Sequence, residues 1–264
     1  MADSQSSKTR KSASRNGGYE NGYGYGGGFQ WLCCLKAWFA ELITCYSLAV
    51  IAVPASVLFF QYTGAHLTPF DYSWAFTVIT IVSGLLFRNF AWFISPHIAL
   101  QALWNMWRRG TMTGGDFWMT TIVSWFGSGG GWFLGAFTIW GIHDGNLHPI
   151  ASLSNIDSFG VIFFYNIVGM VLQCHLYTLA TSKQEWSWKI LGMGLLQGVL
   201  IERFAPIVGG FFNLWASLAF MLVFDNWGST QFWAILLATF LAPFITAIFT
   251  STLFRMPSTI DEED

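Results

Sequence analysis

The chain has 264 residues, of which 54% are hydrophobic and 19% aromatic, whereas only 10% are charged. This composition excludes an ordinary soluble domain and predicts a polytopic membrane protein, because membrane helices carry few charges and use aromatic and small residues for anchoring and packing. The formal net charge of −2 offers no basic surface for nucleic acid. The expected surroundings are therefore the lipid bilayer and other membrane proteins.

The first 30 residues form a segment of their own, rich in Ser, Gly, Asn and Tyr. They lack the apolar core of a signal peptide, so we expect a retained and disordered cytosolic tail. Cys33 and Cys34 come directly after it, just before the first apolar run. Cysteines at this place are either S-palmitoylated or remain two unmodified thiols at the interface.

Six apolar runs follow, and each reaches the roughly 20 residues that are needed to cross a bilayer. They cover residues 35–62, 72–94, 115–142, 158–181, 187–209 and 230–254. The expected outer loops at 63–71, 143–157 and 225–229 contain no Lys or Arg, whereas the inner segments contain many. The positive-inside rule predicts six spans with both termini cytosolic, and we favour the plasma membrane. Residues 257–264 are expected to form an acidic cytosolic tail.

Two further apolar segments, 96–107 and 214–224, are too short to span and are expected to be re-entrant half-helices. Each begins at a residue that can cap a helix, Ser95 or Asn213, and Pro96 suits the first helical position. Their positive ends would then point at the bilayer midplane. The order of spans and half-helices repeats over about 35–142 and 158–255, which predicts an inverted repeat within one transmembrane domain, 31–256.

These segments resemble the major intrinsic protein family, the aquaporins and glycerol facilitators. Ala40-Glu41-Leu42 with Thr44 resembles the motif that opens the family's first span. The two Asn-Pro-Ala boxes of the family correspond here to the degenerate triplets Ser95-Pro96-His97 and Asn213-Leu214-Trp215. The resemblance implies an all-α, aquaporin-like fold of six transmembrane helices and two half-helices, and a homotetramer with one potential pore per subunit.

The resemblance also assigns roles to single residues. The positions of the family's selectivity filter are occupied here by Ala75, Ile201 and Ala216, so the filter lacks its Arg and its His. Glu41 is expected to accept hydrogen bonds from the backbone of the first re-entrant loop. In the fourth span, Asn166 replaces the corresponding Glu.

Several of these residues admit two interpretations. Ser95 and Asn213 either contact the solute or only cap their helices. His97 either gates or selects by protonation or is a buried hydrogen-bonding residue, which we favour. Trp215 either narrows the lumen or turns away into packing.

Two further groups lie outside the boxes. Arg203, next to Glu202 near the outer end of the fifth span, either supplies positive charge at the outer mouth or makes an ion pair or subunit contact. The glycines from 127 to 131, with Gly135, predict a close seam between helices or between subunits.

The sequence offers no Ser-His-Asp set, paired carboxylates or metal-ligand cluster, so neither an enzyme nor a cofactor is expected. The expected function is passive permeation of water or a small uncharged solute such as glycerol, urea, ammonia or a gas. The alternative is a membrane scaffold, or a subunit of a larger assembly, with an occluded pore.

Overall fold

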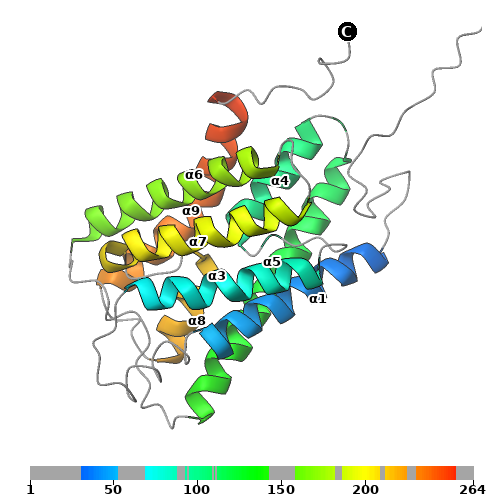
Figure 1. Cartoon of the computed structure of the whole chain (residues 1–264). Helices are drawn as coiled ribbons and strands as arrows, with labels where there is room; N and C mark the ends of the chain where they lie inside the picture. The colour runs from blue at the N-terminus through cyan, green and yellow to red at the C-terminus, as the bar shows by residue number, and fades with distance from the viewer. Residues whose placement is uncertain are drawn as a thin grey trace, which may run out of the picture.

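The computed structural model describes residues 31–52, 69–87, 93, 95–108, 110, 112–142, 158–181, 186–208, 212–224 and 230–253. Within these ranges the chain is mostly helical and contains no strand, which agrees with the predicted all-α class (Figure 1). The two tails predicted at residues 1–30 and 257–264 lie outside the described residues.

Six longer helices lie where the apolar runs predict spans. They are α1 (Trp31–Ser47, continued by the π-helical turn η1, Leu48–Ala52), α3 (Pro69–Leu86), α5 (Gly114–Ile142), α6 (Phe159–Thr181), α7 (Trp186–Val208) and α9 (Thr230–Leu253). The two short helices are α4 (Pro96–Arg108) and α8 (Leu214–Val223), at the predicted half-helix positions.

Local sequence explains where α4 ends and where α5 begins. Gly110, just after α4, has a φ of 71°, a left-handed conformation that glycine adopts without steric cost. Thr113 then caps α5, because its Oγ1 accepts a hydrogen bond from the Asp116 N–H at 3.1 Å. Asp116 also places a carboxylate in the first turn, where the helix dipole favours negative charge.

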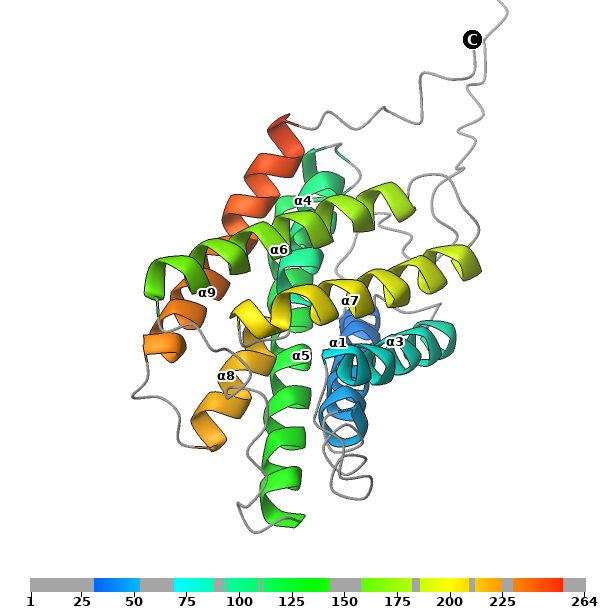
Figure 2. The same cartoon turned by 60° about the vertical axis from the view of Figure 1, so that its left-hand side comes forward.

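The helix contacts are similar when each helix of the first half of the chain (α1, α3, α4, α5) is replaced by its counterpart in the second half (α6, α7, α8, α9). α1 packs on α5 as α6 packs on α9, and α4 packs on α9 as α8 packs on α5. The pairs α4–α5 and α8–α9 correspond in the same way, while α3 and α7 pack on each other. Figure 2 shows α5 through the middle of the molecule, with α4 beside its upper half and α8 beside its lower half.

Three glycines of α5 lie against α1, as expected for a close seam between helices of one chain. A Cβ on Gly127 would lie 2.6 Å from the Trp38 carbonyl oxygen, and one on Gly131 would lie 2.8 Å from the Cys45 Cβ. A Cβ on Gly135 would also overlap the α1 side of the seam. The prediction of an interhelical seam is therefore confirmed, because only small residues allow two backbones to approach this closely.

Length and composition alone identify one candidate membrane span among the described residues, Cys34–Ile51. The other apolar helical segments are shorter, such as Trp74–Leu86 and Phe159–Cys174. A single such helix does not establish a membrane protein, since the core helix of a soluble protein has the same properties.

Candidate functional site

The first turns of α4 and α8 meet at the middle of α5. Trp125 of α5 donates a hydrogen bond from Nε1 to the Pro96 carbonyl oxygen, at 3.1 Å, where α4 begins. Gly129, one turn further along α5, faces the indole ring of Trp215 where α8 begins. The two α5 residues that contact these helix starts are therefore one helical turn, about 5.4 Å, apart.

The helix α6 also contacts the starts of both α4 and α8. Its Gln173 bonds His97 at the start of α4, and its Gly169, one turn earlier, faces the ring of Phe212 next to the start of α8. Along α5 the contact with α4 comes first, whereas along α6 the contact with α8 comes first. The two helices therefore pass the pair of helix starts in opposite chain directions.

The start of α8 is capped as predicted. Asn213 has an extended backbone, and its Oδ1 accepts from the N–H groups of Trp215 at 3.0 Å and Ala216 at 3.4 Å. The preceding Phe212 has a φ of 50°, which is a strained conformation for a bulky residue. Its ring is buried in the groove at Gly169, so packing holds the strained residue in place.

The start of α4 differs from the prediction in one respect. The Ser95 carbonyl oxygen accepts from the Ala99 N–H at 3.0 Å, and Pro96 is the first helical residue, as expected. The Ser95 hydroxyl, however, is buried and has no hydrogen-bond partner among the described residues. A capping side chain accepts from the second or third N–H of a helix, so Pro96 at the first position does not explain why the hydroxyl makes no such bond.

Glu41 and Asn166, the two polar residues singled out in the first and fourth spans, bond differently. Glu41 is fully buried, and its Oε1 accepts from the Phe93 N–H just before α4, which confirms its expected structural role. Asn166 is buried but donates from Nδ2 to the Ile162 carbonyl oxygen of its own helix, at 2.9 Å.

His97 belongs to a chain of buried side chains. Its Nε2 and the Gln173 Oε1 are 2.6 Å apart, and Gln173 donates from its Nε2 to the Gln197 Oε1. All three side chains are buried. His97 is therefore a buried residue that is hydrogen-bonded to another helix.

Trp215 is turned into the packing of α5. A Cβ on Gly129 would lie 3.0–3.3 Å from the indole, and the Phe133 ring lies edge-on to it with centroids 6.4 Å apart. Trp215 is half-buried and packs against α5 through these contacts. Leu214, which precedes it, is buried in the core between α8 and α9.

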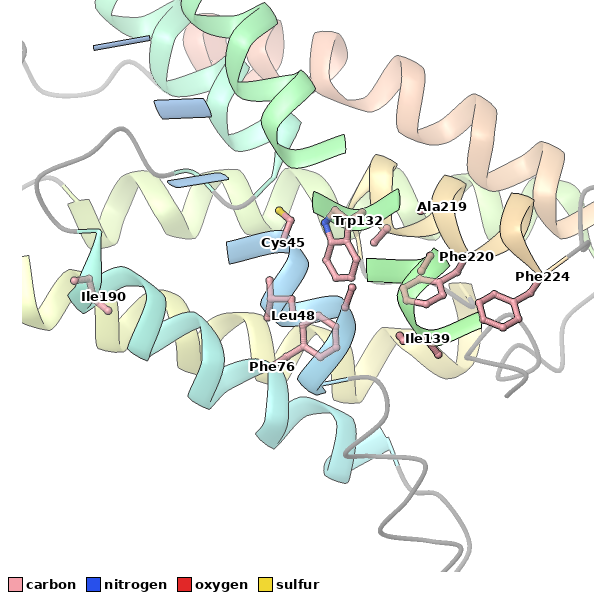
Figure 3. Close-up of a cluster of buried hydrophobic side chains, with 12 residues drawn as sticks. Cys45, Leu48, Phe76, Trp132, Ile139, Ile190, Ala219, Phe220 and Phe224 are labelled. Atoms are coloured by element: carbon pink, nitrogen blue, oxygen red, sulfur yellow. The ribbon is translucent and has the colours of Figure 1, made fainter. Parts of the chain in front are cut away.

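Two of the three expected filter residues come together in an apolar cluster. Ala216 is fully buried in it, and Ala75 packs against it. Its largest members are aromatic: Trp132 stacks on Phe76 with centroids 6.2 Å apart and lies edge-on to Phe220 at 6.0 Å (Figure 3). This region offers no charge and little hydrogen bonding to a solute.

The remaining candidates lie at the edge of the described residues or outside them. Arg203 is exposed on α7, so its side chain lies at the surface of a single protomer. The side chains of Ile201, Glu202 and Cys33 are outside the described residues. Cys34 lies near the start of α1 and is half-buried.

The sequence interpretation missed Gln173, Gln197 and Phe212. Both glutamines stand in apolar runs expected to span the membrane, where an uncharged polar residue signals a partner on another helix. That signal could have found the glutamines, but their pairing across 24 residues of sequence could not be read from it. Phe212 carries no comparable signal, because the left-handed conformation favours Gly or Asn over Phe.

Across the described ranges no three His, Cys, Asp or Glu side chains lie close enough to hold a metal ion. No protein-family model matches the chain, and no curated protein matches it either. What the protein does is therefore inferred from the geometry of its own residues.

Proposed function

We propose that the protein is an aquaporin-like integral membrane channel through which water or another small uncharged solute permeates passively. The observation that carries the proposal is that the starts of α4 and α8 contact residues one turn apart on α5, and again residues one turn apart on α6. Two helix starts at one level present two positive dipole ends there, which repel cations and leave neutral solutes free to pass.

The repeated packing supports an inverted repeat as the architecture. Exchange of α1, α3, α4 and α5 with α6, α7, α8 and α9 reproduces the main contacts between helices. Each half contains three long helices, so the second half would cross the membrane in the opposite direction. A homotetramer is the expected assembly.

The distribution of polar and apolar side chains supports a membrane location. Large apolar residues are exposed along every long helix, for example Phe39 at 47%, Phe126 at 67% and Phe164 at 60%. Polar side chains such as Glu41 and Gln173 are buried instead. Lipid tails would cover these exposed apolar side chains, and extended exposed apolar surface is typical of interaction with a membrane or a partner.

A second candidate function is a scaffold with an occluded pore. Its support is the aromatic cluster of Trp132, Phe76 and Phe220, which includes Ala216 and packs against Ala75. If this cluster closes the lumen, the same fold would serve assembly instead of transport.

Stopped-flow light scattering on reconstituted vesicles separates the two functions. A channel raises the permeability to water, glycerol, urea or ammonia above that of protein-free vesicles of the same lipid. An occluded scaffold leaves all four permeabilities at the level of bare lipid, which would refute the channel.

A negative charge introduced at the start of α8 tests whether the positive helix ends repel cations. Asn213→Asp keeps an oxygen that caps the helix but adds negative charge, so we expect the cation leak to rise while the vesicles still conduct solute. The matched control is Asn105→Asp, the same change nine residues past Pro96 in α4 and about 13 Å along the helix from its start. An equal leak in both variants would contradict the proposed barrier.

A further inference from the structure

The hydrogen-bonded chain of His97, Gln173 and Gln197 joins three helices inside the bundle. The Gln173 oxygen can only accept, so the His97 Nε2 donates to it, and the Gln173 Nε2 donates onward to the Gln197 oxygen. The three side chains are 1%, 1% and 6% exposed. The chain thus runs in one direction from the first turn of α4 through α6 to α7.

The chain stands beside the meeting point of the two helix starts. His97 is the second residue of α4, and Gln173 lies one turn along α6 from Gly169, which holds Phe212 next to α8. Ile98, adjacent to His97, packs between α6 and α7 against Cys174 and Met193. The three polar side chains are therefore surrounded by apolar packing and are linked to one another.

Polar groups in such surroundings are costly unless they are hydrogen-bonded. A solute that enters between them must replace the bonds it breaks. Water, ammonia, urea and glycerol can both donate and accept, so they can do this with little loss. An apolar molecule would leave an imidazole or an amide without a partner, and a site of that kind rejects it strongly.

On the basis of the channel function proposed above, we infer that His97, Gln173 and Gln197 form the solute-selecting constriction. They take over the role that the apolar filter positions Ala75 and Ala216 cannot perform. The substrate class is small neutral molecules that both donate and accept hydrogen bonds, and dissolved apolar gases are excluded from it.

The first test removes the central amide. Gln173→Met keeps the length of the side chain but removes both hydrogen bonds, so we expect permeability to water and urea to fall by about tenfold. The matched control is Gln101→Met, the same change at an equally buried glutamine of α4, which should leave both permeabilities within twofold of the wild type. Size-exclusion elution identical to that of the wild type shows that each variant is folded.

The second test asks whether position 97 faces the solute path, and it holds even if Gln173→Met fails to fold. His97→Cys vesicles are treated with a small thiol-reactive mercurial, which should block solute flux. Ile98→Cys, whose side chain lies in the apolar cluster, should keep its flux. The wild type should keep it too, because Cys45 and Cys174 are buried and the half-buried Cys34 lies near the start of α1, away from His97.

The outcomes separate this inference from the function on which it rests. A wild-type protein that conducts none of the solutes refutes the channel itself. A wild type that conducts, while Gln173→Met matches Gln101→Met and the mercurial leaves His97→Cys unblocked, refutes the constriction alone.

Discussion

A single methyl group at Gly169 tests how α8 is positioned. A Cβ at this place in α6 would lie 2.6 Å from both Cδ1 and Cζ of the Phe212 ring, and the ring Cε1 lies closer still. Ordinary van der Waals contact begins at 3.4 Å. Gly169→Ala therefore displaces the ring by about 0.8 Å or more. Phe212 packs against Met170, Leu200 and Ala242, so the ring has little room to move.

The cost follows from this overlap. Overpacking of a filled core costs about 1–3 kcal/mol, and better helix propensity returns up to about 1 kcal/mol. We expect a net loss of about 1–2 kcal/mol in the free energy of unfolding. At about 2–4 °C for each kcal/mol, the melting temperature of the purified protein in detergent should fall by roughly 2–8 °C. Tryptophan fluorescence during heating measures it.

Gly160→Ala is the matched control in the same helix, because a Cβ there would meet nothing within 4 Å. It should melt at the wild-type temperature or slightly above. Phe212→Leu removes part of the ring and should recover stability in the Gly169→Ala background, so that the double variant costs less than the sum of the two single changes. Equal melting temperatures for Gly169→Ala and Gly160→Ala, or strict additivity with Phe212→Leu, would refute this account of the packing.

Three further predictions follow from neighbouring contacts. Gly131→Ala should lower the melting temperature in detergent by several degrees, since its Cβ would press on α1, whereas Gly130→Ala, with 3.6 Å of clearance, should leave it unchanged. Asn213→Ala should cost about 0.5–2 kcal/mol by removing the cap of α8, and Asn213→Asp should restore most of it, as chemical unfolding would measure. Glu41→Leu removes the buried acceptor of the Phe93 N–H and should cost about 1–3 kcal/mol in the same unfolding assay, with identical stability contradicting its structural role.

The positions of the helices could be predicted because each depends on local sequence. Apolar runs of sufficient length coincide with the six long helices, and Asn213 marks the start of α8 through its own side chain. Glu41 could be placed from the resemblance, since a buried carboxylate next to a loop needs backbone donors. The helix positions and the cap each involve one segment, whereas the bond between Glu41 and Phe93 spans 52 residues and is expected from the resemblance alone.

The pairing of distant residues could not be predicted in the same way. Gln173 meets His97 across 76 residues of sequence, and nothing local chooses that partner over another buried polar residue. The Phe212 conformation is a further case, because the groove at Gly169 that stabilises it lies on another helix. Each feature depends on how two helices are rotated and shifted relative to each other.

Trp215 shows why residues at matching positions cannot be assigned to a pore from their order alone. Successive residues of a helix point about 100° apart, so the rotation of α8 about its own axis decides whether Trp215 or Ala216 faces the interior of the other half. That rotation is set by Gly129, which leaves room on α5 for an indole ring that any larger residue would fill. Trp215 in the second half of the chain and Gly129 in the first are therefore complementary in volume. With the indole packed at Gly129, the next residue, Ala216, lies in the apolar cluster.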